Sequence, residues 1–507
     1  MMRAALFLLL WPAVLQAGPR FQDVSADLPV AHVYDGGWEH FVGGGVAVFD
    51  CNGDALPEFL AAGGENPARL FVNRGGMAFV LGNGIPQLDG VTGAYPLDID
   101  SDGLLDLAVL RVGPNLLLKG MGDCRFEDRT TEWGFDPGDR WSTAFSATWE
   151  PGQDWPTLAV GNYVDRSDPA GPFEACDANT LHRPDGTGYA TPILLEPGFC
   201  ALSILFSDRM LTGRADLRVS NDRHYYVRGG SEQMWRMEPL ALMGPEEGWQ
   251  PISIWGMGIA SRDLNGDRLP EVVLTSMGDQ LMLIAQPDGS YRGAPYDIGT
   301  YAQRPHVGDD GRPATGWHAE FADVDNDGRD DLFIAKGNVD QMPTNAMRDP
   351  NNLLMQGPDG RFTEASVEAG VATVERARGA SLADFDGDGR LDLVVVNRRA
   401  PLELYRNVTS DTGNWLALEP RQAGPNGFAV GAFLEVETPG GVTHLREITV
   451  GGGHVGGQAG PQHFGLGPDT AAKVRVRWPD GGVSDWVGVE ANRRLSLWRD
   501  GAGLDLR

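Results

Sequence analysis

An Asp-rich segment of nine residues occurs five times along the chain and constrains its fold more than any other feature. Every copy carries a carboxylate at positions 1, 5 and 9 and Asp or Asn at position 3. The residues at these four positions are Asp50, Asn52, Asp54 and Glu58; Asp98, Asp100, Asp102 and Asp106; Asp263, Asn265, Asp267 and Glu271; Asp323, Asp325, Asp327 and Asp331; and Asp384, Asp386, Asp388 and Asp392. A short apolar run rich in Val, Ile, Leu and Phe follows each copy, so each copy predicts a tight loop leading into a strand.

The spacing of the copies predicts a β-propeller. The loops that begin at 263, 323 and 384 are 60 and 61 residues apart, and those at 50 and 98 are 48 apart. The gap between the loops at 98 and 263 has room for two further units, near 149 and 208, which keep a strand but lose most of the acids. Such a period is typical of propeller blades, whereas a linear β-solenoid, the alternative, has shorter repeats. We therefore expect an all-β chain, with a propeller of about seven blades over residues 18–408 and a small β domain over 411–500.

The oxygen atoms of the acidic loops predict Ca²⁺ as the cofactor. Side chains at positions 1, 3, 5 and 9, with a backbone carbonyl at position 7, can surround one Ca²⁺, and hard carboxylate oxygens suit neither zinc nor copper. An EF-hand needs Glu at position 12. The loops of this chain are therefore not EF-hands, because position 12 is apolar in all five: Ala61, Val109, Leu274, Ile334 and Val395. Asp, Asn and Gly also form simple turns, but 18 carboxylates at these positions would repel one another without a cation.

Charge and hydropathy predict an exported protein. The formal net charge of −29 disfavours nucleic acid and anionic membranes as partners. Residues 1–17 have the pattern of a signal peptide, with Arg3 before an apolar run and Ala17 before the expected cut. A buried N-terminal strand is the alternative, which Pro12 and Arg3 make less favourable. No later segment approaches about 18 uninterrupted apolar residues, so we expect no membrane span and a periplasmic or extracellular location.

Four cysteines remain for the exported protein: Cys51, Cys124, Cys176 and Cys200. An even count in an oxidising compartment permits two disulfides. A bond between Cys176 and Cys200 would staple a polar stretch, although the sequence leaves the pairing open.

Catalytic signatures are missing from the sequence. It has no GxSxG elbow, no HExxH and no Walker loop. One GxGxxG string covers residues 451–456, but no helix follows, and we interpret it as a Gly-rich loop. His444, His454 and His463 are interpreted as packing or turn residues rather than as a metal site. The tryptophans are expected mainly between blades, with surface stacking on sugars as the alternative.

With these residues in view, the acidic loops resemble those of the FG-GAP/VCBS repeat family, which is related to the integrin α-subunit propeller. The tail resembles the ASPIC/UnbV domain in Asn414-Trp415, Val430-Gly431-Ala432, Arg446-Glu447, His463-Phe464-Gly465 and Trp478-Pro479-Asp480-Gly481. Together the two parts look like a member of the cartilage acidic protein family. The resemblance implies calcium ligands in the five acidic loops and none in the units near 149 and 208.

A rigid propeller without a visible catalytic set predicts a binding protein rather than an enzyme. The expected partner is an extracytoplasmic protein or glycan. Two other functions remain as alternatives. One is a carbohydrate-active hydrolase or lyase with its site in the central propeller pocket. The other is a structural assembly factor of the cell envelope.

Overall fold

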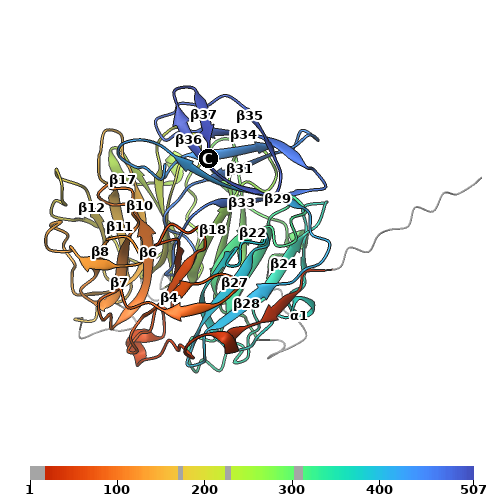
Figure 1. Cartoon of the computed structure of the whole chain (residues 1–507). Coiled ribbons are helices and arrows are strands. Elements are labelled where there is room, and N and C mark those ends of the chain that lie inside the picture. Colours follow the sequence, from red (N-terminus) through yellow and green to blue (C-terminus); the bar gives the residue numbers. More distant parts are fainter. Residues whose placement is uncertain (1–17, 169–174, 223–229, 302–311) are drawn as a thin grey trace, which may run out of the picture.

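The computed structural model describes residues 18–168, 175–222, 230–301 and 312–507, so the predicted signal peptide lies outside the described residues. The described chain is a seven-bladed β-propeller with a second β domain lying across one end of it (Figure 1). The predicted all-β architecture of about seven blades is therefore confirmed. The α-helices within these ranges amount to the single short turn α1 (Ser366–Ala369), and no described helix is long and apolar enough to cross a membrane.

Each blade is a meander of four antiparallel strands, and the first strand of each lies next to the propeller axis. Blade 1 comprises β2 (Val46–Phe49), β3 (Glu58–Ala61), β4 (Arg69–Asn73) and β5 (Phe79–Leu81). Blade 2 comprises β6 (Val91–Leu97), β7 (Asp106–Gly113), β8 (Leu116–Gly120) and β9 (Phe126–Asp128). Blade 3 comprises β10 (Arg140–Thr148), β11 (Thr157–Asn162), β12 (Asn179–His182) and β13 (Ile193–Leu195). Blade 4 comprises β14 (Ala201–Ser207), β15 (Asp216–Asn221), β16 (Gln233–Met237) and β17 (Leu240–Leu242).

The remaining three blades follow the same plan. Blade 5 comprises β18 (Gly256–Arg262), β19 (Glu271–Ser276), β20 (Leu281–Ala285) and β21 (Tyr291–Gly293). Blade 6 comprises β22 (Gly316–Ala322), β23 (Asp331–Lys336), β24 (Asn352–Gln356) and β25 (Phe362–Glu364). Blade 7 comprises β26 (Arg376–Ala383), β27 (Asp392–Arg398), β28 (Glu403–Asn407) and β1 (Phe21–Asp23). Because β1 pairs with β28, the first strand of the chain completes the last blade and closes the ring.

Apolar side chains fill the spaces between neighbouring blades. Phe59 of blade 1 stacks on Phe71 with ring centroids 4.6 Å apart and meets the edge of Phe385 from blade 7 at 5.9 Å. The tryptophans of the propeller are mostly buried, and Trp141 and Trp317 are fully so, which confirms the packing role expected for them.

The C-terminal domain packs two four-stranded sheets around a separate core. One sheet holds β29 (Asn414–Arg421), β33 (Gln462–Gly467), β36 (Arg493–Asp500) and β37 (Gly503–Leu506). The other holds β30 (Phe433–Glu437), β31 (Thr443–Glu447), β34 (Ala471–Arg477) and β35 (Val487–Glu490). Leu416, Leu434, Phe464 and Val474 are among the buried residues between them. The connection between β28 and β29 contains the predicted domain boundary.

One segment of the C-terminal domain enters the propeller channel. We call this segment, residues 450–458, the glycine plug. Its backbone forms β-bridges with the innermost strands of five blades, through Val48, Ala94, Ala147, Leu205 and Ile259. The plug reaches blade 6 through the His454 N–H, which donates to Nδ1 of His318 at 3.1 Å, and blade 7 through Gln458, whose amide donates to the Leu382 carbonyl. All seven blades therefore contact the plug.

Glycines on both sides allow this close approach of backbones. A Cβ atom on Gly45 or on Gly93 would lie 1.7 Å from the carbonyl oxygen of Val455. His454 is the bulky member of the plug and is fully buried, with Nδ1 3.1 Å from the Met257 carbonyl. Burial lowers the pKa of His454 to about 3, so the ring enters the channel uncharged. The interpretation of residues 451–456 as a Gly-rich loop is confirmed.

We predict that Gly456→Val loosens the plug. Its Cβ would lie 2.2 Å from the Val46 carbonyl oxygen, and overpacking of this kind costs about 1–3 kcal/mol of unfolding free energy. Urea unfolding and limited proteolysis of the region 450–458 measure the effect. Gly488→Val in β35 is the matched control, because a Cβ there meets no atom within 4 Å and the backbone φ is not positive. Equal stability of the two variants would show that the plug is not tightly packed.

Candidate metal centres

The five acidic loops connect the first and second strands of blades 1, 2, 5, 6 and 7, so all of them lie at the same end of the propeller. We number them loop 1 (residues 50–58), loop 2 (98–106), loop 3 (263–271), loop 4 (323–331) and loop 5 (384–392). The C-terminal domain, drawn in blue in Figure 1, lies across this end.

The position-1 carboxylate organises each loop. It accepts the N–H of position 6 in every copy and a second N–H from position 4 or 5. Position 6 has a positive φ in all five loops, which explains the glycine found there in three of them. The residues at position 6 are Ala55, Gly103, Arg268, Gly328 and Gly389.

The position-9 carboxylate is buried at the base of each loop. One of its oxygens accepts the N–H of position 2 in all five copies. In loops 2, 4 and 5 the other oxygen accepts an N–H from the third strand of the blade. The residues at position 9 are Glu58, Asp106, Glu271, Asp331 and Asp392, none more than 2% exposed. Backbone hydrogen bonds therefore fix these carboxylates in place.

Position 3 separates the loops into two kinds. In loops 2, 4 and 5 it is Asp, and oxygens of positions 1, 3 and 9 lie within 4.8 Å of one another. In loops 1 and 3 it is Asn, and the amides of Asn52 and Asn265 each donate to the position-9 Glu at 3.0 Å. The Asp residues at position 5, although predicted as ligands, lie outside the three clusters and accept the N–H of position 7 instead.

Burial makes the negative charge of the clusters costly. Burial, together with the neighbouring carboxylates, raises the pKa of Asp98 to about 6 and that of Asp106 to about 8. The pKa values of Asp323 and Asp331 in loop 4 lie well above the usual range for the same reasons. A divalent cation among these oxygens would remove the penalty.

Two position-3 carboxylates carry buried oxygens that accept no hydrogen bond. Oδ1 of Asp386 is in this state, and so is Oδ1 of Asp100, whereas Oδ2 of Asp386 lies 2.6 Å from Nη2 of Arg406. Buried polar atoms are nearly always paired, so these oxygens fit a cation. Hard oxygen ligands at this spacing suit Ca²⁺ or Mg²⁺, and positions 1, 3 and 9 of loops 2, 4 and 5 could hold one.

The loops also form the surface on which the C-terminal domain rests. In loop 4, the side-chain oxygen of Asn326 lies 2.6 Å from Nε2 of His463, and the backbone carbonyl of Asn326 accepts the Gly467 N–H. Arg446 of β31 donates to Asp330 at 2.7 Å, and both side chains are buried. His463 therefore belongs to the interface between the domains, as a packing residue.

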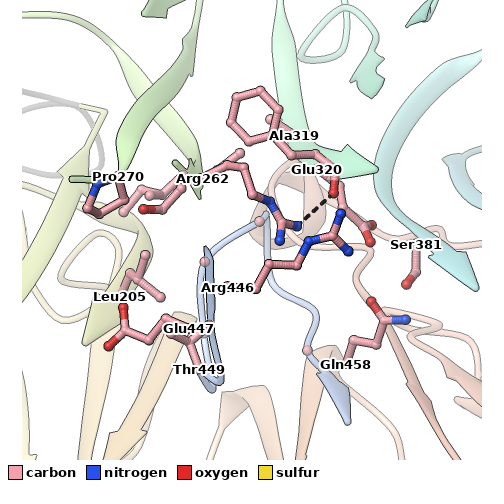
Figure 2. A pocket seen from close by; sticks show the side chains of 18 of the residues that line it. Leu205, Arg262, Pro270, Ala319, Glu320, Ser381, Arg446, Glu447, Thr449 and Gln458 are labelled. Atoms are coloured by element: carbon pink, nitrogen blue, oxygen red, sulfur yellow. Dashed lines mark hydrogen bonds between the residues drawn. The ribbon is translucent and has the colours of Figure 1, made fainter. Parts of the chain in front are cut away.

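A cavity of about 180 Å³ separates the propeller axis from β31. Figure 2 shows the guanidinium groups of Arg262 and Arg446 together in this cavity, with the Arg262 group donating to the Phe321 carbonyl at 3.0 Å. Asp330 pairs with both arginines, at 3.5 and 2.7 Å. The sequence did not single out Asp330 or Arg262, because neither occupies a ligand position.

Two disulfides use all four cysteines. Cys51, at position 2 of loop 1, bonds to Cys124 in blade 2, and Cys176 bonds to Cys200. The first bond ties an acidic loop to the neighbouring blade. The second links the two ends of the polar stretch between Cys176 and Cys200.

Comparison with known proteins confirms the predicted resemblance. The family described as FG-GAP-like repeat matches residues 50–109, 263–334 and 323–395, and the family described as ASPIC and UnbV matches residues 422–503. Cartilage acidic protein 1 of Homo sapiens is 33% identical over 163 residues, 32% of this chain and 24% of that protein. Its counterpart in Xenopus tropicalis is 29% identical over 245 residues, 45% of this chain and 34% of that protein. The chain thus spans about a quarter to a third of the length of these curated relatives.

Among solved structures, BBS1N in complex with ARL6DN aligns with a TM-score of 0.47 and 10% identity, covering 78% of this chain and 99% of that one.

We predict that Arg446→Met weakens the docking of the C-terminal domain. Methionine keeps the packing on Phe464 but leaves the buried Asp330 with a single arginine at 3.5 Å. Breaking a buried ion pair in this way costs about 3–5 kcal/mol, which urea unfolding measures. Arg493→Met is the control, because its pair with Glu490 is exposed and contributes at most about 1 kcal/mol. Similar losses in the two variants would contradict the importance of the Arg446–Asp330 contact.

Proposed function

We propose that this chain, which carries FG-GAP-like repeats and an ASPIC and UnbV domain, is an exported, calcium-binding recognition module. Its partner is an extracytoplasmic protein or glycan. One observation carries the proposal: the C-terminal domain covers the acidic-loop end and fills the channel, so the opposite end of the propeller is the one left to meet a partner. Long connections gather at that end, among them residues 24–45 between β1 and β2, and 337–351 between β23 and β24.

The disulfides support export. All four cysteines are paired, and such pairs persist in oxidising compartments rather than in the cytosol. The acidic loops support calcium, because their buried carboxylates have hard oxygens and raised pKa values.

A pocket of about 600 Å³ at the open end, between blades 2 and 3, favours a glycan among the possible partners. Amide, carboxylate, guanidinium and imidazole groups line it, including those of Asn162, Asp177, Arg140 and His182. Trp38 is outside the pocket lining but 48% exposed, and its ring lies 5.3 Å from that of Trp141, the residue next to Arg140 of the pocket wall. An exposed indole next to planar polar groups can stack on a sugar ring and hydrogen-bond its hydroxyls.

The carboxylates at the central cavity support recognition over hydrolysis. Glu320 accepts the Leu382 N–H at 3.1 Å, and Glu447 accepts the Ser207 hydroxyl at 2.6 Å and the Asp208 N–H at 2.7 Å. These bonds tie blade 6 to blade 7 and the C-terminal domain to blade 4. The two groups thus have structural partners in the place where the hydrolase alternative needs free acids.

Removal of calcium is expected to lower the melting temperature reversibly. A ligand that binds only the folded state stabilises it by about 2.7 kcal/mol per site at a concentration of 100 Kd. Thermal melts of the mature protein with calcium, with EDTA and with calcium restored measure this. Identical melts in the three conditions would refute calcium binding and leave the acidic loops as turns.

A glycan panel and an envelope extract, both probed in calcium buffer, test recognition. We expect a glycan to be retained and Trp38→Ala to weaken its binding about tenfold or more, as for an exposed aromatic side chain that stacks on a sugar ring. Tyr296→Ala is the control, because Tyr296 is 75% exposed and follows β21 of blade 5, whereas the pocket lies between blades 2 and 3. Retention of a protein alone would move the partner class from glycan to protein, and retention of nothing would refute the recognition function.

A further inference from the structure

One position on the third strand of a blade faces the acidic loop. In blade 2, for example, Leu118 pairs with Leu107, so the next residue of the third strand lies opposite position 9, and the other four blades have the same register. The residues there in blades 1, 2, 5, 6 and 7 are Val72, Lys119, Ile284, Met355 and Arg406. Three loops thus face an apolar side chain and two face a basic one.

Lys119 reaches into loop 2. Its ammonium group donates to Asp100 and, at 2.5 Å, to Asp102, and its side chain is only 18% exposed. The positive charge thus pairs with the position-3 carboxylate, one of the three that could hold a metal ion, and with the position-5 carboxylate beside it. Lysine is rare in this chain, with Lys336 and Lys473 as the other two.

Arg406 leaves loop 5 more open. Its Nη2 lies 2.6 Å from Oδ2 of Asp386 and 3.7 Å from Oδ2 of Asp388, but its side chain is 41% exposed. The carboxylate of Asp386 is 2% exposed, and its Oδ1 accepts no hydrogen bond. This buried oxygen therefore stays available to a cation, and the arginine can move into solvent.

Blades 3 and 4, which follow blade 2 around the ring, also carry internal cations. In blade 3, Arg183 donates twice to Glu150, at 2.8 and 2.9 Å. In blade 4, Arg209 donates to Asp216 at 3.1 Å. Basic side chains therefore neutralise the loop ends of three consecutive blades.

We propose that Lys119 replaces the metal ion in loop 2, so that calcium occupies at most four loops, all in the continuous arc of blades 5, 6, 7 and 1. This inference rests on the proposed calcium binding. A calcium ion entering loop 2 would meet a positive charge that already pairs with Asp100, one of the three candidate ligands, and like charges at contact distance repel strongly. In loops 1, 3 and 4, as far as the structure describes them, no basic side chain bridges positions 3 and 5, and the buried Arg446 at loop 4 pairs with Asp330 at position 8.

Native mass spectrometry of the full mature protein, loaded with calcium, counts the bound ions. Lys119→Met copies the residue of blade 6, and we expect it to bind one calcium more than the natural protein. Met355→Lys copies blade 2 and should bind one fewer. Lys473→Met is the control, because this exposed lysine pairs with Glu437 away from the loops, and it should leave the count unchanged.

Melting with EDTA gives a second readout. Without calcium, Lys119→Met should melt below the natural protein because loop 2 has lost its cation, and calcium should restore it. A folded Lys119→Met that binds no additional ion, or a natural protein that binds five, would overturn the assignment of loop 2. A natural protein that binds none and ignores EDTA would overturn calcium binding itself, and this inference with it.

Discussion

The backbone hydrogen bonds between the glycine plug and the innermost strands determine how the rest of the structure is arranged. Inner strands of a propeller present unpaired N–H and C=O groups toward the channel, and such groups need partners. Here the partners come from the C-terminal domain, through bridges to five blades. The channel becomes part of the core, and removing the domain would expose backbone groups along the axis. The plug therefore makes two domains behave as one folded unit.

Ion pairs connect the acidic loops of the propeller to the C-terminal domain. Loop 4 illustrates this, because Asp323 and Asp331 are buried beneath the C-terminal domain and Asp330 pairs with Arg446 of that domain. In loop 3, Arg268 donates to Glu435 of the C-terminal domain at 2.8 Å. The loops that would hold metal are thus the loops that carry the domain. Under the proposed calcium binding, metal loading and domain docking stabilise each other, because both require the same loop conformation.

The sequence predicted the blades because their signals are local. Blades 3 and 4 were located by strand spacing without acids, since a blade depends on apolar strands and not on its metal loop. The plug was not predicted, because its partners lie hundreds of residues away and glycine contributes no side-chain pattern. A signal did exist: six of the ten residues 451–460 are Gly, more than a turn requires. Lys119 was missed because its position relative to loop 2 follows from strand register, not from the loop motif.

The ring is divided by function as well as by charge. Blades 2, 3 and 4 carry their own cations through Lys119, Arg183 and Arg209, and the open pocket lies between blades 2 and 3. The loops of blades 5 and 6 face the C-terminal domain. The pocket of the proposed recognition surface therefore belongs to the arc whose loops need no metal, while the plug pairs with blades of both arcs. A recognition site built in this way keeps its shape when calcium varies, and calcium acts on it only through the stability of the whole ring.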